Sequence, residues 1–271
     1  MKTRLITAAV LVPALFLLTL VASKWVAAVV FGILLAISAY ELLYGTRVVR
    51  HTRLVLYSAL MAFGMSMWSL FAASNAYLLL MLLVFTLLLF AEMMADHVKV
   101  RFEMLALCYV GGFVIPYLLG ALMRILSMNV GRYVILIPFV VAFMSDSGAY
   151  FVGLKFGKHK LAPVVSPNKT IEGALGGIVT AMASMVIYAL VLDLLPVNFR
   201  VNYGLAILYG LGGSVVGVFG DLCFSVIKRQ TGIKDYGNLI PGHGGVLDRF
   251  DSMVTVAPLM EAMLLLVPMV M

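Results

Sequence analysis

The sequence predicts an all-α polytopic membrane protein, and three observations lead to this fold class. Hydrophobic residues make up 63% of the 271 residues and charged residues only 11%, whereas soluble domains are about half apolar and about a quarter charged. Apolar runs of about 20 residues, the length that crosses a bilayer as a helix, follow one another along the chain. Lys and Arg gather in every second connection between these runs, as in the cytoplasmic loops of membrane proteins. We therefore expect a single integral membrane domain over residues 1–271.

The apolar runs are candidate spanning helices. The first follows the basic tetrapeptide MKTR and has features of a signal peptide, but its length and the immediate start of a second run favour an uncleaved helix. In chain order, about nine transmembrane helices are expected at 5–23, 25–45, 54–73, 76–95, 105–126, 133–154, 173–195, 204–227 and 252–270.

The distribution of cations predicts the orientation in the membrane. With the N-terminus in the cytoplasm, 15 of the 19 Lys and Arg residues fall on the cytoplasmic side. The four on the opposite side are Lys24, Arg124, Arg132 and Arg200. The positive-inside rule therefore predicts an N-in, C-out topology, and it explains most of the net charge of +7 without a nucleic-acid partner. A basic cytoplasmic face also attracts anionic lipid head groups and nucleotide phosphates.

The first five predicted spans contain few residues that carry chemistry. Glu41 and Glu92 lie near cytoplasmic helix ends. We expect both to be structural carboxylates that reach the interface or pair with a nearby cation, Arg47 or Lys99.

The run from Ser145 to Gly177 differs from the earlier spans because it places polar groups inside and just beyond an apolar helix. It reads SDSGAYFVGLKFGKHKLAPVVSPNKTIEGALGG. Asp146 falls in the middle of a predicted span, where a carboxylate costs roughly 2.5–3.5 kcal/mol on insertion scales. That cost indicates that Asp146 has a partner or a function.

The basic loop after that span ends in a helix-start signal. Ser166 is expected to cap the next helix, with Pro167 at its first position and Asn168 after it. A helix start whose N–H donors are free binds anions, and Lys169 stands beside this one. Glu172 is expected to hold Lys169 in place or to assist at a metal.

The second polar run spans Gly220 to Ser252 and reads GDLCFSVIKRQTGIKDYGNLIPGHGGVLDRFDS. Asp221, Ser225 and Lys228 are spaced i, i+4 and i+7, so they share one helical face. Small residues earlier on the same face allow a neighbouring helix to approach closely. We therefore expect Asp221 to face protein or a polar cavity and not lipid.

The end of this run combines a Gly-rich turn, PGHGG, with two more carboxylates. Such a turn can present backbone N–H groups to an anion. Asp248 and Asp251 are three residues apart, so they share a face if a helix starts there. Carboxylates and cations at a membrane boundary favour Mg²⁺ with a phosphate ligand; the alternative is a cytoplasmic loop whose charges pair with one another and with water. His243 has no second His or Cys at ligand spacing, and it is either a hydrogen-bonding loop residue or a catalyst.

Both polar runs carry extended motifs. The first is S-D-x-G-A-Y-x-x-G-x-x-F-G-K-H-K-L-A-P-x-x-S-P-x-K-T-x-E-G, which begins at Ser145, and the second is S-x-x-K-R-x4-K-D-x-G-x2-I-P-G-H-G-G-x-x-D-R-x-D, which begins at Ser225. They resemble the signatures of the phosphatidate cytidylyltransferases, or CDP-diacylglycerol synthases. One position departs from the pattern: Ile171 stands where sequences of that family often have an aromatic residue. We expect N-terminal helices at 1–130 and a catalytic core of helices and cytoplasmic loops at 131–271.

The resemblance implies that CTP and phosphatidic acid react to give CDP-diacylglycerol and pyrophosphate, a step of phospholipid biosynthesis. It also implies a homodimer in a bacterial-type cytoplasmic (inner) membrane, with the active site facing the cytoplasm. The residues fit this chemistry independently. A phosphomonoester has a second pKa of about 6, so phosphatidate is largely dianionic at neutral pH and can attack CTP without a protein nucleophile. Positioning, Mg²⁺ and basic side chains then promote the transfer.

The charged residues of the two motifs are expected to divide into metal ligands and phosphate-binding groups. Asp221, Asp248 and Asp251 are expected to hold Mg²⁺, with Asp146 as an additional ligand or as an acceptor behind the ligands; a second cation beside Mg²⁺ is left open. With Lys169, these four are the expected catalytic residues. The residues expected to bind the triphosphate or the lipid phosphate are Ser166, Asn168, Lys169, Lys228, Arg229, Lys234, His243 and Arg249.

Two other functions are compatible with the composition. A CTP-dependent lipid enzyme of the polyprenol kinase type would share a similar membrane core. An ion-coupled secondary transporter would use intramembrane Asp residues to carry protons or ions. Against a transporter, nine spans do not divide into equal inverted repeats, and the charged groups cluster in loops on one side.

Overall fold

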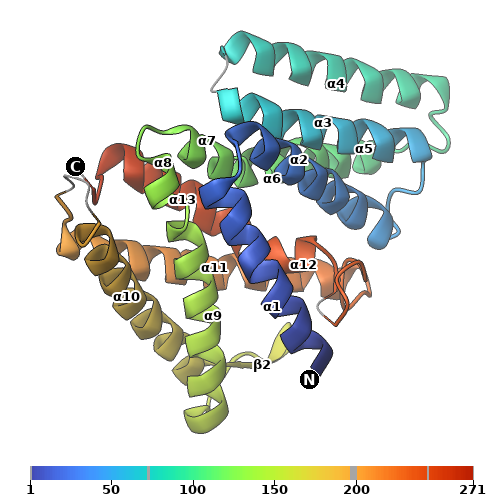
Figure 1. Cartoon of the computed structure of the whole chain (residues 1–271). Helices are drawn as coiled ribbons and strands as arrows, with labels where there is room; N and C mark the ends of the chain where they lie inside the picture. Colours follow the sequence, from blue (N-terminus) through green and yellow to red (C-terminus); the bar gives the residue numbers. More distant parts are fainter. Residues whose placement is uncertain (1, 72–73, 196–199, 243, 271) are drawn as a thin grey trace. The chain divides into compact units, whose positions relative to one another are not determined.

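A computed structural model describes residues 2–71, 74–195, 200–242 and 244–270, and most of these residues are helical (Figure 1). Among the described residues, seven helical segments are long and apolar enough to cross a membrane. This confirms the prediction of a helical, polytopic membrane protein. The seven segments are Lys24–Gly45, Thr52–Phe71, Asn75–Ala95, Phe102–Ser127, Gly131–Phe156, Ile171–Asp193 and Tyr203–Gln230.

The first and last predicted spans, 5–23 and 252–270, correspond to shorter apolar helices. The described apolar part near the N-terminus is Ala9–Val21, and the last helix, α13, is Met253–Leu266. A helix of 14 residues rises only about 21 Å at 1.5 Å per residue, whereas the hydrocarbon core is about 30 Å thick. Length and composition therefore support seven of the predicted spans directly.

The chain divides into two compact units. The first comprises Met1–Arg132 and Lys228–Phe250, and the second comprises Tyr133–Ile227 and Asp251–Met271. Elements of the first are α1 (Lys2–Phe16), η1 (Leu17–Val21), α2 (Lys24–Tyr40), η2 (Glu41–Gly45), α3 (Thr52–Phe71), α4 (Asn75–Ala95), α5 (Phe102–Tyr109), η3 (Val110–Val114), α6 (Ile115–Leu119), α7 (Ala121–Ser127) and α12 (Leu247–Phe250), where η denotes a π-helical turn. Elements of the second unit are α9 (Ile137–Phe156), β1 (Lys160–Ala162), β2 (Ser166–Thr170), α10 (Ile171–Asp193) and α13. Two helices have residues in both units: α8 (Gly131–Val134) and α11 (Tyr203–Gln230).

In the first unit, α3 packs against α2, α4 and α5 (Figure 1). An ion pair between Arg53 and Glu92 (3.3 Å) joins α3 to α4, and the Tyr57 hydroxyl donates to the same carboxylate (3.1 Å). The structural role expected for Glu92 is therefore confirmed, but the expected partner was wrong. Lys99 instead pairs with Asp96 (3.1 Å), and its hydrogen bonds lower the pKa of that carboxyl.

In the second unit, α9 and α10 lie side by side (Figure 1), and their contact depends on glycine. A Cβ added to Gly176 would lie 2.5 Å from Cβ of Val152, and one added to Gly177 would lie 2.6 Å from the carbonyl oxygen of Ser145. A side chain at either position would separate the two helices. Close packing of this kind is typical of membrane helices, where small residues allow the backbones to approach.

A two-stranded antiparallel hairpin connects α9 to α10 and corrects one prediction. Strands β1 and β2 pair Lys160 with Thr170 and Ala162 with Ser166. The helix begins only at Ile171, and its cap is Thr170, whose Oγ1 accepts the N–H of Gly173 (3.1 Å). The prediction that Ser166 caps a helix with Pro167 at its first position was therefore wrong. The reason is that the hairpin holds this backbone extended, and a second capping residue stands four positions later.

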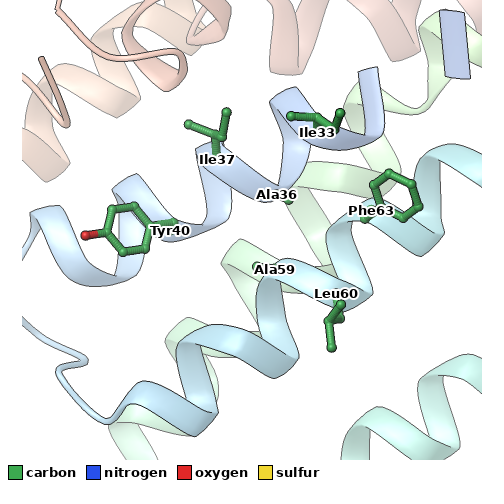
Figure 2. Close-up of a pocket in the computed structure, with 7 residues that line it drawn as sticks. All are labelled: Ile33, Ala36, Ile37, Tyr40, Ala59, Leu60 and Phe63. Carbon is green, nitrogen blue, oxygen red and sulfur yellow. The ribbon is translucent and has the colours of Figure 1, made fainter. Parts of the chain in front are cut away.

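A hollow of about 330 Å³ lies between α2 and α3 (Figure 2). Figure 2 shows Tyr40 at one end of it and Phe63 towards the other. All seven of its residues are uncharged, and none belongs to the two motifs: Ile33, Ala36, Ile37, Tyr40, Ala59, Leu60 and Phe63. The hollow therefore lies apart in sequence from the charged residues that are candidates for the functional site.

Candidate functional site

In the second unit, the two polar runs of the sequence meet at an ion pair between Lys169 of the first motif and Asp221, which lies four residues before the second motif. Lys169 is in the last part of β2, directly before α10, and Asp221 is in the long helix α11. Both side chains are partly buried, with 27% and 22% of their surface exposed. The hairpin therefore places a cation of the first motif beside a carboxylate of the second polar run.

The surroundings of Asp221 bring Asp251 into the same region of the second unit. Ser225 donates to Asp221 at 3.4 Å, as expected for residues one helical turn apart. A Cβ added to Gly220 would clash with the Thr255 side chain and would lie 3.3 Å from the carbonyl oxygen of Asp251. The backbone that carries Asp251 is thus packed against the residue that precedes Asp221.

Glu172 has a different partner from the one predicted. Its carboxylate accepts the backbone N–H groups of Lys158 (3.1 Å) and His159 (3.2 Å), and Nδ1 of His159 lies 2.6 Å from Oε1. The side chain therefore holds the turn before β1. It is the hairpin itself, and not Glu172, that sets the position of Lys169.

The remaining candidates of the first motif are exposed or partly buried. Asp146 lies on an exposed position of α9, beside the buried Ser145 that faces α10. Ser166 and Asn168 both belong to β2, with Asn168 exposed and Ser166 partly buried. These positions are compatible with contact to a substrate, but they do not add to the pairing of Lys169 with Asp221.

In the first unit, Asp248 is the centre of a hydrogen-bonded cluster. Its Oδ2 accepts the backbone N–H groups of Tyr236 (2.8 Å) and Gly245 (3.0 Å), and its Oδ1 accepts a bond from Lys228 Nζ (3.0 Å). The side chain is almost fully buried, with 2% exposed. The Lys228 ammonium also lies 5.4 Å from the centroid of the Tyr236 ring. We refer to Lys228, Tyr236, Gly245 and Asp248 as the Asp248 cluster.

The predicted helix shared by Asp248 and Asp251 needs correction. Asp248 and Asp251 do not share one continuous helix, because α12 ends at Phe250 and a turn at Asp251 and Ser252 precedes α13. The Asp251 carboxylate accepts the N–H of Ser252 (2.8 Å) in that turn. His243 lies outside the described residues.

The other predicted phosphate-binding cations are accessible. Lys234 and Arg249 are exposed, and Arg229 is exposed in the last turn of α11. Within the turn that precedes α12, Gly242 and Gly244 have φ of 76° and 84°. Those values are costly for other residues, so glycine is required at both positions.

Mg²⁺ fits the chemistry of these residues, since it prefers carboxylate oxygens. Asp221 is partly exposed, and the backbone of Asp251 lies next to it in the same unit. Across the described part of each unit, no three His, Cys, Asp or Glu side chains gather into a metal-binding group. Asp248 belongs to the other unit, so a centre that combines Asp221, Asp248 and Asp251 stays a prediction.

The chain matches the model of the Cytidylyltransferase family over residues 2–267. It belongs to the cytidylyltransferase family. It is 41% identical to the phosphatidate cytidylyltransferase of Staphylococcus haemolyticus over 165 residues, which are 60% of this chain and 58% of that protein. It is 49% identical to the phosphatidate cytidylyltransferase of Bacillus subtilis over 127 residues, which are 47% of this chain and 45% of that protein. These matches cover less than two thirds of the length of either relative.

In this cytidylyltransferase-family chain, one side chain that supports the second motif was not predicted to belong to the site. Glu41 was expected to reach the interface or to pair with Arg47. It is instead buried, and it accepts the backbone N–H groups of Val246 and Leu247. The cost of a carboxylate in an apolar helix was the available signal, but nothing in the sequence indicates a partner more than 200 residues away.

Proposed function

We propose that this chain transfers the cytidylyl group of CTP to phosphatidic acid, giving CDP-diacylglycerol and pyrophosphate for phospholipid biosynthesis. The observation that carries the proposal is the ion pair between Lys169 and Asp221, which joins the two polar runs of the sequence within one unit. The relatives of similar sequence, which are named phosphatidate cytidylyltransferases, support the same reaction.

The transfer needs few groups from the protein. A phosphatidate oxygen forms a bond to the α-phosphorus of CTP while the bond to the β-phosphate breaks, and pyrophosphate leaves. The attacking phosphate is already largely ionised at neutral pH, because its second pKa is about 6. The protein must therefore align two polyanions and offset their charge.

The charged residues divide this work in our proposal. Lys169 binds the triphosphate, and Lys228, Arg229, Lys234 and Arg249 attract the phosphates of CTP or lipid. Asp221, Asp248 and Asp251, with Asp146 as an additional ligand or as an acceptor behind the ligands, hold Mg²⁺; a second cation beside Mg²⁺ is left open. When bound, Mg²⁺ offsets phosphate charge and fixes phosphate geometry.

The membrane arrangement is part of the same proposal. The chain crosses a bacterial-type inner membrane about nine times, N-in and C-out, so that both motifs face the cytoplasm, where CTP is found. Support comes from the 15 of 19 cations that this orientation places inside. The homodimer rests on the family resemblance alone.

The test is the reaction of the purified chain in detergent micelles with CTP, Mg²⁺ and phosphatidic acid. We expect pyrophosphate release in step with transfer of the cytidine label into lipid extracts, and neither with diacylglycerol in place of phosphatidate. A polyprenol kinase would release CDP instead of pyrophosphate. A transporter would show no turnover without a sealed compartment, so absence of lipid-bound cytidine would refute the proposal.

A further inference from the structure

Glu41 is a buried carboxylate in the first unit that the proposed reaction does not yet use. It is the first residue of the π-helical turn η2, at the end of the apolar helix α2, and 4% of its surface is exposed. Its Oε1 accepts the N–H of Val246 (3.0 Å) and its Oε2 accepts the N–H of Leu247 (2.8 Å). Bonds from N–H groups to a carboxylate are roughly twice as strong as bonds between neutral groups.

The glycines of the second motif leave space for this carboxylate. A Cβ added to Gly245 would lie 2.5 Å from Oε2 of Glu41, and one added to Gly237 would clash with the same side chain. Both glycines belong to the loop that leads into α12. The loop is thus built around Glu41 on two sides.

Glu41 and Asp248 hold consecutive amides of one segment. The N–H of Gly245 points to Asp248, and the next two, from Val246 and Leu247, point to Glu41. Asp248 also accepts a hydrogen bond from the Lys228 ammonium (3.0 Å). The Glu41 carboxylate and the Asp248 cluster are therefore both bonded to the backbone of residues 245–247. A shift of this segment would displace both Asp248 and its lysine.

We propose that Glu41 is a positioning residue of the cytidylyl-transfer site, acting through the backbone at residues 245–247 on Asp248 and Lys228. This inference rests on the proposed function. Glu41 acts on the substrate only indirectly, because it fixes the segment that supports Asp248 and, through Asp248, the ammonium of Lys228. Groups of this kind behind a site usually contribute 10–100-fold, by order of magnitude, to ligand affinity or activity.

The test compares Glu41→Gln with Glu92→Gln in the full chain. Glu92 is a matched control, because it is also a carboxylate in an apolar helix of the first unit and bonds to Arg53 and Tyr57, away from both motifs. Two quantities are measured on each folded, purified protein: amide hydrogen exchange without substrate or metal, and kcat and KM for CTP.

Loss of the charge should loosen the loop and slow the reaction. In the unmodified chain, the amides of residues 245–247 should exchange much more slowly than that of the exposed Asn238. Glu41→Gln should raise their exchange and lower kcat/KM for CTP by about 10–100-fold, and Glu92→Gln should change neither. Gly245→Ala, which crowds the same carboxylate, should repeat the effect and serves if Glu41→Gln does not fold.

Three outcomes would overturn the proposal. The first is fast exchange at residues 246 and 247 in the unmodified chain, which needs no variant to fold. The second is a Glu41→Gln variant in which both the amide exchange of residues 245–247 and kcat/KM for CTP equal those of the unmodified chain. The third is raised exchange with unchanged kcat/KM, which would make Glu41 a structural residue only. If the unmodified chain does not convert CTP and phosphatidate, the proposed function fails, and hydrogen exchange alone decides whether Glu41 holds the loop.

Discussion

At the scale of single residues, two carboxylates of this protein hold loops in the same way. Glu41 accepts the N–H groups of residues 246–247 in the first unit, and Glu172 accepts those of residues 158–159 in the second. Each carboxylate accepts two consecutive backbone amides that lack a partner in regular structure. The amides of residues 246–247 belong to buried residues, where an amide without a partner is costly, whereas residues 158–159 are exposed. Each motif thus contains one loop that is anchored by a carboxylate from a helix.

The first prediction concerns Lys169, which forms an ion pair with Asp221. A partly exposed ion pair contributes little to stability, so Lys169→Ala should lower the melting temperature only slightly. Its charge is needed for the triphosphate, so kcat/KM for CTP should fall by about 10²–10³-fold, as when one donor to a developing charge is removed. Arg50→Ala, in an exposed part of the α2–α3 connection, is the control and should be near parental. A parental kcat/KM for Lys169→Ala would remove this lysine from the site.

A second prediction separates Asp221 from Asp248 by their burial. Asp221→Asn keeps the size of a partly exposed side chain and should fold, but it should lose most of kcat, because a metal ligand acts in the transition state. Asp248→Asn removes a buried charge from Lys228 and should also lower stability, by about 3–5 kcal/mol as for other broken buried pairs. Thermal melting and steady-state kinetics on the same preparations measure both effects.

The hypothesis that Asp221 and Asp251 bind one Mg²⁺ also predicts the activity of the double variant. If Asp221 and Asp251 hold one ion, the double Asn variant should be hardly slower than the slower single variant, since ligands of one site act as a unit. Multiplicative losses would indicate two independent roles. Folded Asp221→Asn with near-parental kcat would show that this carboxylate is not an essential ligand.

At the scale of elements, glycines on α11 determine how the second unit packs around Asp221. The helix contacts Val141 of α9 and Met260 of α13 at Gly213, and Thr255 of α13 at Gly220. Thr255 in turn donates to the carbonyl oxygen of Val216 (3.0 Å). This face therefore fixes α13 against the turn that carries Asp221.

Two alanine substitutions on this one helix should have opposite effects. A Cβ at Gly212 would meet its nearest neighbour, in Leu259, at 3.7 Å, an ordinary contact, so Gly212→Ala should be neutral or stabilise by up to about 1 kcal/mol. Gly220→Ala would collide with Thr255 and should cost about 1–3 kcal/mol, as overpacking does. Because Asp221 is adjacent, Gly220→Ala should also lower kcat. Equal melting temperatures and equal kcat values for the two variants would contradict this account of the α11–α13 contact.

The sequence predicts some elements better than others, because some depend on local composition and others on contacts between residues far apart in the chain. Apolar runs predicted seven spans well, because burial in a bilayer demands about 20 apolar residues whatever the neighbours are. Residues 166–170 were misread as a helix start, because a local capping signal competes with pairing to β1. The pairing of Lys169 with Asp221 and the role of Glu41 depend on contacts across 52 and 205 residues, which no local pattern indicates.

At the scale of the whole molecule, the charge pattern and the proposed reaction both predict that the two motifs face the cytoplasm. The chain is an integral membrane protein with seven candidate spans among its described residues. A reaction that consumes CTP requires both motifs on the cytoplasmic side. The positive-inside bias, with only four of 19 cations outside, independently predicts that side for both loops.

The last prediction tests that topology in intact cells with an impermeant thiol reagent. In a background without Cys108 and Cys223, the two free cysteines of the chain, single cysteines replace Arg50, Lys158 or Asn202. The first two should be shielded until the membrane is opened, because their two loops contain seven of the 15 predicted cytoplasmic cations: Arg47, Arg50, Arg53, Lys155, Lys158, Lys160 and Lys169. Asn202 should react from outside, because an odd number of crossings separates it from Lys158 when Ile171–Asp193 spans the membrane. Labelling of the Lys158 position in sealed cells would place the Lys169 loop away from cytoplasmic CTP, and the proposed function would then require a different orientation.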